Sequence, residues 1–320
     1  MNENLPLVSV LSITYNQAPF IRQCLDGILA QHRDFPIEII IHDDCSTDGT
    51  DEIIRSYAER YPDIIRSYFE NENQYSKGVN GLFATFCMPH VKGRYVAVCE
   101  GDDWWSDPDK LRTQIEFLEK HHEYDFCCHR FHTYFENTGK LTDDAASFCF
   151  GHKPYIELTV PLCLNVWLTQ PLSLLCRREP MEKAEAMMSR FRYARDFHFF
   201  FYLLKNGRGA SLNRFMGVYR RHDGGINTRL EETERFRLNY ILHKDIYEQS
   251  CDREALAPYR ESIPLYMRHI SDAGLRRELM AEWLLTSPSR LERYCMSRGL
   301  YGLLHSLRFR ARRLAILLRR

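Results

Sequence analysis

The chain has 320 residues, of which 44% are hydrophobic, so it is long enough for one large soluble domain or two ordinary ones. Lysine plus arginine equals aspartate plus glutamate at 43 each, and we expect no nucleic-acid partner. No window of 18 uncharged apolar residues is present, which argues against a membrane-spanning helix.

The charge is unevenly distributed along the chain. Residues 293–320 hold eight arginines and no acidic residue, so residues 1–292 contain 35 basic and 43 acidic side chains and a net charge of −8. The eleven cysteines lie largely inside apolar runs, not at the spacings of a disulfide framework or a zinc site. This pattern favours a reducing compartment. We therefore expect a cytoplasmic protein, with any membrane contact made peripherally on the inner face.

The first part of the chain alternates between predicted strands and helices. The strands are expected at 7–13, 38–42, 64–69 and 94–98, and the helices at 19–31, 50–61, 82–88 and 108–122. Such alternation predicts right-handed βαβ units and a mostly parallel sheet with helices on both faces. Ligands of these sheets bind beyond the carboxyl ends of the strands.

Polar clusters follow three of the predicted strands, at residues 14–17, 43–48 and 100–103. We expect them to converge on one cleft. The third cluster contains three acids, and carboxylates packed this closely raise one another's pKa unless a cation lies among them. Oxygen ligands favour Mg²⁺ or Mn²⁺. The alternative is that the acids form a solvated turn before the helix that begins near Pro108.

The middle of the chain contributes two further candidate residues. Strands are predicted at 124–135, 172–176 and 209–218 and helices at 179–191 and 193–204, while 136–157 is expected to be irregular. Asp196 falls in the first turn of a helix, where the macrodipole stabilises a negative charge. It is either a general base or an acid that only stabilises its own helix. His222 is either a metal ligand or a loop histidine.

Beyond residue 228 only helices are predicted, at 230–250, 253–271 and 274–286 and in the last segment. In that segment, residues 293–320, leucines form one stripe and most arginines lie elsewhere, which is typical of an interfacial anchor on an anionic membrane. The competing interpretation is a helix packed on its own domain or on a partner. We therefore divide the chain into a domain at 1–227 and a helical region at 228–320.

These residues resemble the family 2 glycosyltransferases of the glycosyltransferase A fold. The resemblance rests on four motifs that occur in the family's order, at 8–16, at 41–50, at 93–103 and at Asp196 with 219–222. It implies an α/β fold with a nucleotide-binding, mostly parallel sheet flanked by helices, followed by a helical C-terminal extension. It also implies inverting, metal-dependent transfer of a sugar from a nucleoside-diphosphate sugar, UDP-linked, to a hydroxyl of a glycan or lipid-linked acceptor, in cell-surface polysaccharide biosynthesis.

The family's functional residues carry over to matching positions of this chain. The donor-binding positions implied by the resemblance are Thr14, Tyr15, Asn16, Asp43, Asp44, Lys77 and Asp102. Asp103 and His222 would bind Mn²⁺ or Mg²⁺, which neutralises the leaving diphosphate. Asp196 would take the proton from the acceptor hydroxyl. The chain departs from many relatives in having Glu100 as the first acid of the metal motif, and Lys77 can equally be a solvated loop lysine.

Two other classes of function stay open. A nucleotidyltransferase shares the nucleotide-binding sheet and the acidic metal site, but it would usually carry a glycine-rich basic loop after the first strand, which residues 14–18 lack. No dinucleotide-binding or P-loop glycine motif is present either. A non-catalytic module that binds nucleotide or carbohydrate would not need a base such as Asp196.

Overall fold

The fold is described from a computed structural model. The described residues are 7–79, 81–144, 146–166, 168–188, 190–191, 196–225, 228 and 230–318. For residues 165, 309 and 312–318 only the backbone is described. The strands are β1 (Val8–Thr14), β2 (Ile37–Asp43), β3 (Ile65–Phe69), β4 (Tyr95–Val98), β5 (Trp104–Trp105), β6 (Phe126–Phe135), β7 (Lys140–Asp143), β8 (Tyr155–Leu158), β9 (Leu175–Arg177) and β10 (Gly209–Arg221).

The helices of the first two thirds of the chain are α1 (Ile21–Leu29), α2 (Thr50–Arg60), α3 (Lys110–Lys120), α4 (Ser147–Phe150), α5 (Val160–Asn165), α6 (Arg178–Met188) and α7 (Asp196–Asn206), with the short turns η1 (Phe83–Cys87), η2 (Met88–His90) and η3 (Pro171–Ser173). Those of the last third are α9 (Glu232–Ser250), α10 (Arg253–Met267), α11 (Ala273–Leu285), α12 (Arg290–Ser297) and α13 (Tyr301–Leu318).

One sheet runs through the first part of the molecule in the order β3-β2-β1-β4-β9-β6-β10-β5, with β7 beside β6 and β8 beside β10. The pairs among β3, β2, β1 and β4 are parallel, as is β6 with β10, whereas β9 is antiparallel to both of its neighbours. The predicted α/β class with a helical extension is confirmed. The sheet is mixed in its second half because β9 and the short strands β5, β7 and β8 run antiparallel to the strands that they pair with.

Both faces of the central strands β1, β2 and β4 are buried, and the alternation of side chains along each strand divides them between two cores. Val10 on β1 and Ile39 on β2 belong to the core with α1, α2 and α3, whereas Leu11 and Ile40 face the core with α6 and α7. Buried residues on both faces explain the continuous apolar runs of these strands. The carboxyl ends of β1, β2 and β4 are left as the edge that carries the polar loops.

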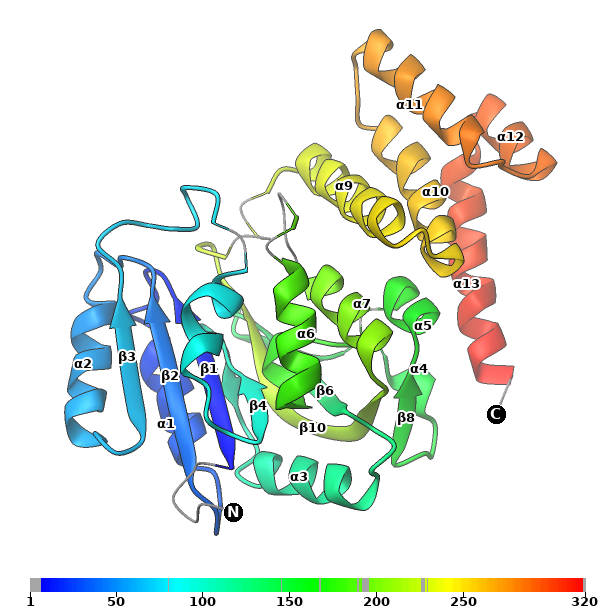
Figure 1. The fold of residues 1–320 in the computed structure, drawn as a ribbon. Helices are drawn as coiled ribbons and strands as arrows, with labels where there is room; N and C mark the ends of the chain where they lie inside the picture. Colours follow the sequence, from blue (N-terminus) through cyan, green and yellow to red (C-terminus); the bar gives the residue numbers. More distant parts are fainter. Residues whose placement is uncertain are drawn as a thin grey trace.

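The C-terminal helices α9 to α13 share a third core, built around residues such as Trp283, Tyr259 and Tyr301, while Ile246 of α9 and Ala255 of α10 belong to the core with α6 and α7. Figure 1 shows them gathered beyond α5 and α7, on the side of the molecule away from β1 to β3. Pro258 and Pro264 lie inside α10. Within the described residues, no helix combines the length and the apolar character needed to cross a bilayer.

Candidate functional site

Asp43, the last residue of β2, ties the ends of two strands together. Thr14 at the end of β1 donates a hydrogen bond from Oγ1 to Asp43 Oδ1 over 2.8 Å, and Ser46 Oγ donates to the same oxygen over 2.6 Å. The backbone N–H of Ser46 donates to Asp43 Oδ2 over 2.9 Å. Because both oxygens accept from the protein, Asp43 primarily sets the shape of the loop that follows β2.

Asp44 fastens the loop of residues 70–78 to the sheet. The backbone N–H groups of Gln74 and Tyr75 donate to its two carboxylate oxygens over 2.6 Å and 3.0 Å. Its own N–H donates to Thr14 O over 2.9 Å. Each carboxylate oxygen keeps further lone-pair capacity, so a nucleotide base at this position would share an oxygen with the loop.

The remaining predicted donor-binding residues lie in the same group of loops. Tyr15 has a side chain that is 48% exposed beside Thr14. Asn16 adopts a left-handed φ of 52°, and its Oδ1 accepts from Thr47 N over 2.8 Å, so its side chain braces two loops. Lys77 is exposed and forms an ion pair with Glu72. Donor binding by these three residues stays a prediction.

The acids after β4 meet the end of β10, which is more than 110 residues away in the chain. His222 Nε2 lies 3.1 Å from Asp102 Oδ2. Asp103 is buried, with 2% exposure, and its Oδ1 accepts from the backbone N–H of Arg220 over 2.8 Å. The structure therefore brings together the three residues that sequence reasoning placed near the diphosphate.

Arg220 belongs to this site, although the sequence analysis assigned it no role. Its guanidinium donates to Asp102 O over 2.8 Å and also contacts the side chains of Glu136 and Gln23. It is 6% exposed and lies 4.6 Å from the ring of Trp104. The motif at 219–222, with basic residues at 220–222, was visible in the sequence, but nothing in it distinguishes Arg220 from Arg221 before their partners are known.

Burial and mutual repulsion shape the electrostatics of the acid cluster. Burial, followed by the charges of Asp102 and Glu100, raises the pKa of Asp103 well above its usual range. The pKa of Glu100 is likewise raised well above its usual range, by burial and then by the charges of Asp196 and Asp102. Asp196 is therefore near the cluster, although β4 and α7 are far apart in the sequence.

The residues present suit a divalent cation. Among the described residues, Asp103 Oδ2 is a buried oxygen with no hydrogen-bond partner, and two carboxylates with an imidazole are a donor set that Mn²⁺ or Mg²⁺ accepts. Within the described ranges, no group of three or more His, Cys, Asp or Glu side chains is placed so that it could hold a metal ion by itself. Phosphate oxygens of a bound nucleotide commonly supply the other ligands of such ions.

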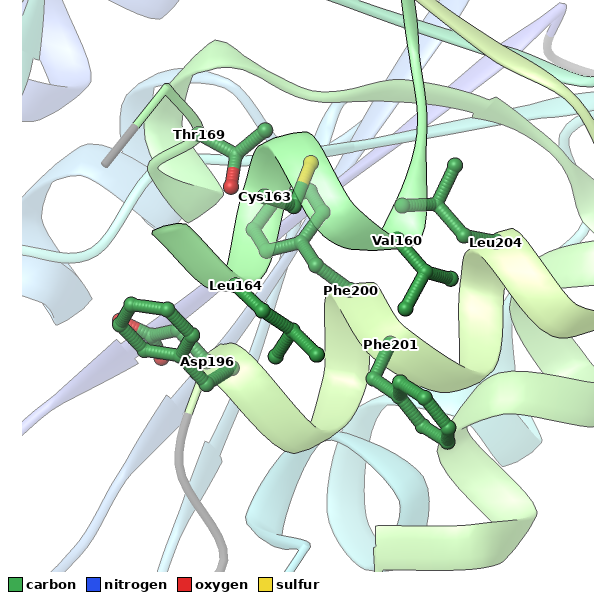
Figure 2. A pocket seen from close by; sticks show the side chains of 9 residues that line it. Val160, Cys163, Leu164, Thr169, Asp196, Phe200, Phe201 and Leu204 are labelled. Atoms are coloured by element: carbon green, nitrogen blue, oxygen red, sulfur yellow. The ribbon is translucent and has the colours of Figure 1, made fainter. Parts of the chain in front are cut away.

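Asp196 is the first residue of α7, and it lies at one end of a pocket between α5 and α7 (Figure 2). The predicted start of its helix at residues 193–195 lies outside the described residues. Asp196 also influences Glu185 on α6: burial, and to a smaller extent the charge of Asp196, raise the pKa of Glu185 to about 8. Whether Asp196 acts as a base stays a prediction.

Comparison with known proteins gives consistent matches. The model of the family described as Glycosyl transferase family 2 matches residues 9–184. An uncharacterized protein of Mycobacterium tuberculosis is 36% identical over 220 residues, which are 68% of this chain and 60% of that protein. The putative teichuronic acid biosynthesis glycosyltransferase TuaG of Bacillus subtilis is 30% identical over 224 residues, 70% of this chain and 82% of TuaG. The alignment thus spans about three fifths of the mycobacterial relative's length.

Solved structures share the fold. Residues 1–349 of S. aureus TarS in complex with UDP-GlcNAc superpose with a TM-score of 0.65 at 18% identity, covering 97% of this chain and 89% of that one. The mannosyltransferase PcManGT from Pyrobaculum calidifontis, in complex with GDP-Man and Mn²⁺, gives a TM-score of 0.53 at 18% identity. The superposition covers 98% of this chain and 85% of PcManGT. The likeness extends through the C-terminal helices as well as the sheet.

Proposed function

Because this chain belongs to glycosyl transferase family 2, we propose that it transfers a sugar from a nucleoside-diphosphate sugar to a hydroxyl group of a glycan or lipid-linked acceptor. A UDP-linked donor is supported by TarS, which binds UDP and UDP-GlcNAc. A role in making cell-surface polysaccharide is supported by the name of TuaG. The two sequence relatives align with 68% and 70% of this chain.

The chemistry that we propose is a single displacement with inversion. Asp196 takes the proton of the acceptor hydroxyl, the acceptor oxygen bonds to the anomeric carbon, and the bond from that carbon to the diphosphate oxygen breaks. The electron pair of the broken bond leaves with the diphosphate. No protein nucleophile is needed. One observation carries the proposal: the acids after β4 lie beside His222, which follows β10. Asp196 is close to these acids, since its charge contributes to raising the pKa of Glu100.

Asp102, Asp103 and His222 are the residues that we propose to hold Mn²⁺ or Mg²⁺. A bound cation would supply positive charge to the departing diphosphate. The protein itself holds the acids in place. Arg220 donates hydrogen bonds from its backbone N–H to the carboxylate of Asp103 and from its guanidinium to the backbone carbonyl of Asp102. Thr14, Tyr15, Asn16, Asp43, Asp44 and Lys77 would line the nucleotide side of the same edge.

Nucleoside diphosphate released from a panel of nucleotide sugars, with and without Mn²⁺, tests this function. We expect Asp196→Asn and Asp103→Asn each to lower turnover by about 100-fold or more without lowering the melting temperature. Asp143→Asn, at an exposed position on β7, is the matched control and should keep full turnover. A folded Asp196→Asn protein with wild-type turnover would contradict the base role, and nucleotidyl transfer without sugar transfer would favour the nucleotidyltransferase.

We also propose that the C-terminal helices hold the enzyme against an anionic membrane. The start of α13 packs on its own domain, since Tyr301 is buried and Arg308 Nη1 lies 2.8 Å from Glu292 Oε1. Leu303 and Leu307, however, are 59% and 53% exposed on the same helix. Exposed leucines beside a basic segment support an interfacial location.

Vesicle sedimentation tests the membrane proposal with the full chain. We expect binding to vesicles that contain phosphatidylglycerol and about tenfold weaker binding by Leu303→Ser/Leu307→Ser. Leu141→Ser, an exposed leucine on β7, is the control. Equal binding by wild type and the double variant would exclude these leucines as the contact.

A further inference from the structure

Helix α7, which begins at Asp196, packs against α9 of the C-terminal helices (Figure 1). Leu242 and Ile246 of α9 belong to the same buried core as the α7 residues from Phe199 to Leu203. They are four residues apart and therefore lie on one face of α9. The helix that carries the proposed base is thus covered by a helix from a later part of the chain.

Two further residues of this part of α9 reach the first turn of α7. The ring of His243 lies edge-on to the ring of Phe197, with 6.3 Å between the ring centroids. Asp245 Oδ2 lies 3.9 Å from His198 Nε2. Phe197 and His198 directly follow Asp196, so both contacts are made within one helical turn of its carboxylate.

The two imidazoles at this contact are buried. The side chain of His198 is fully buried, and His243 is 8% exposed. Burial lowers the pKa of His243 to about 4, so at neutral pH its ring is uncharged and packs on Phe197 as an aromatic ring. Close-packed buried side chains leave little room for a helix to shift. The first turn of α7 is therefore held from the side of α9.

A contact of a different kind holds the other end of α7. Lys205 Nζ donates to Asp252 Oδ2 over 2.7 Å. Asp252 also caps α10, since its side chain accepts from the N–H of Glu254 over 2.9 Å. Because the side chain of Lys205 is 45% exposed, this ion pair adds little stability. The two ends of α7 are nevertheless set against successive helices, α9 at its start and the start of α10 at its end.

We propose that α9 positions the base, with His243 and Asp245 as positioning residues that act through Phe197 and His198. This inference rests on the proposed function, because it needs Asp196 to be the base. A general base must lie within about 3 Å of the hydroxyl that it deprotonates, and a displacement of about 1 Å can lower the rate by about 100-fold. The proposed donor site lies at the ends of β1, β2 and β4, so loss of this support should lower kcat and leave the donor KM unchanged.

Hydrogen exchange resolved by segment tests the support directly in the full chain. His243→Ala removes the ring that contacts Phe197, and we expect the amides of 196–204 to exchange about tenfold faster than in wild type. His243→Phe keeps an aromatic ring and should exchange as wild type does. His269→Ala is the matched control, because His269 stacks on Phe236 of the same helix α9 at 4.1 Å. Unchanged exchange of α7 in a folded His243→Ala protein, or equal acceleration by His269→Ala, overturns the proposal.

The release of nucleoside diphosphate separates positioning from general stability. With the donor that wild type turns over, we expect His243→Ala to lower kcat about tenfold or more with the donor KM within about twofold of wild type, and His243→Phe to keep kcat. Wild-type kcat in His243→Ala overturns the positioning role. If His243→Ala does not fold, Asp245→Asn alters the contact with His198 and carries the same expectations. Wild-type exchange and kcat in a folded Asp245→Asn protein then overturn the proposal.

These outcomes separate failure of this inference from failure of the proposed function. Turnover that Asp196→Asn abolishes and His243→Ala leaves unchanged overturns the support by α9 and leaves the transferase function intact. Full turnover by a folded Asp196→Asn protein contradicts the base role and with it the positioning of a base by α9. No turnover of any donor, together with faster α7 exchange in His243→Ala, contradicts the transferase function and keeps the support of α7 by α9.

Discussion

Arg220 joins three segments at the candidate site through one planar group. Its guanidinium contacts the carbonyl of Asp102 and the side chains of Glu136 and Gln23, and its backbone N–H independently holds Asp103. Lysine keeps the positive charge and the backbone N–H, but its single ammonium cannot reproduce a planar fork of donors. The two contributions of this residue can therefore be separated by a conservative substitution.

We expect Arg220→Lys to destabilise the protein by about 1–3 kcal/mol and to raise the KM for the donor, because the loop at Asp102 loses its guanidinium while Asp103 keeps its hydrogen bond. Urea unfolding and donor titration measure the two effects. Arg221→Lys, one residue further along β10, is the control, since Arg221 contacts only the ring of Phe135 among the interactions described for its side chain. Equal effects of both variants would contradict this role.

The difference between Arg220 and the acids shows what could be predicted for single residues. Asp43 ends β2, and Asp102 and Asp103 lie in the loop after β4, so the rule that ligands bind at the carboxyl ends of parallel strands was enough to group them. The role of Arg220 depends on Gln23 and Glu136, which come from distant positions in the chain. The braced conformation of Asn16 was hidden for the same reason, because its partners lie in the loop after β2.

Helix α6 carries a buried acid, Glu185, close to the functional edge. Burial, with a smaller effect from the charge of Asp196, raises its pKa to about 8, against 4.5 for an exposed glutamate. The folded protein therefore binds more protons than the unfolded chain between about pH 4.5 and pH 8. Stability falls as pH rises through this window, because the proton must be lost from a buried group.

We expect Glu185→Gln to flatten this pH dependence and to be more stable than wild type at pH 8 by a few kcal/mol, since the amide needs no proton. Urea unfolding from pH 5 to pH 9 measures the slope. Glu182→Gln lies on the same helix at an exposed ion pair with Arg178 and should keep the wild-type slope. A wild-type slope in Glu185→Gln would show that Glu185 is ionised in the folded state.

Strands and helices were predicted correctly where the pattern of apolar residues along the chain itself indicates them. The alternating apolar strands and amphipathic helices of the first 120 residues were found within a few residues of their observed bounds. Residues 136–157, expected to be irregular, instead contain β7, α4 and most of β8. Apart from the buried Leu158, the residues of these four-residue strands are exposed or half-buried, and the strands form because they pair with β6 and β10. Pairing with a distant strand leaves no periodic signal in so short a segment.

At the scale of the whole molecule, we propose that residues 228–320 form a unit that is stabilised separately from the sheet. Glu292 on α12 is central to it, because its carboxylate lies 2.8 Å from Arg308 on α13 and 3.3 Å from Arg260 on α10. Burial alone would raise its pKa, but the hydrogen bonds from Arg308 and Ser289 outweigh burial and lower the pKa to about 2. The stabilisation from this carboxylate is therefore present above about pH 4.5 and is lost as pH falls towards 2.

We expect Glu292→Gln to weaken the packing of α10, α12 and α13 at pH 7 by about 3 kcal/mol, because two arginines lose the charge that compensates their burial. Hydrogen exchange resolved by segment should show faster exchange in these helices, with β1 to β4 unchanged. Glu278→Gln, at an exposed position on α11, is the control and should leave exchange as in wild type. Equal acceleration in the sheet would mean that helices and sheet unfold together, which contradicts a separate unit. Faster exchange confined to the helices would place the boundary of the unit near the start of α9.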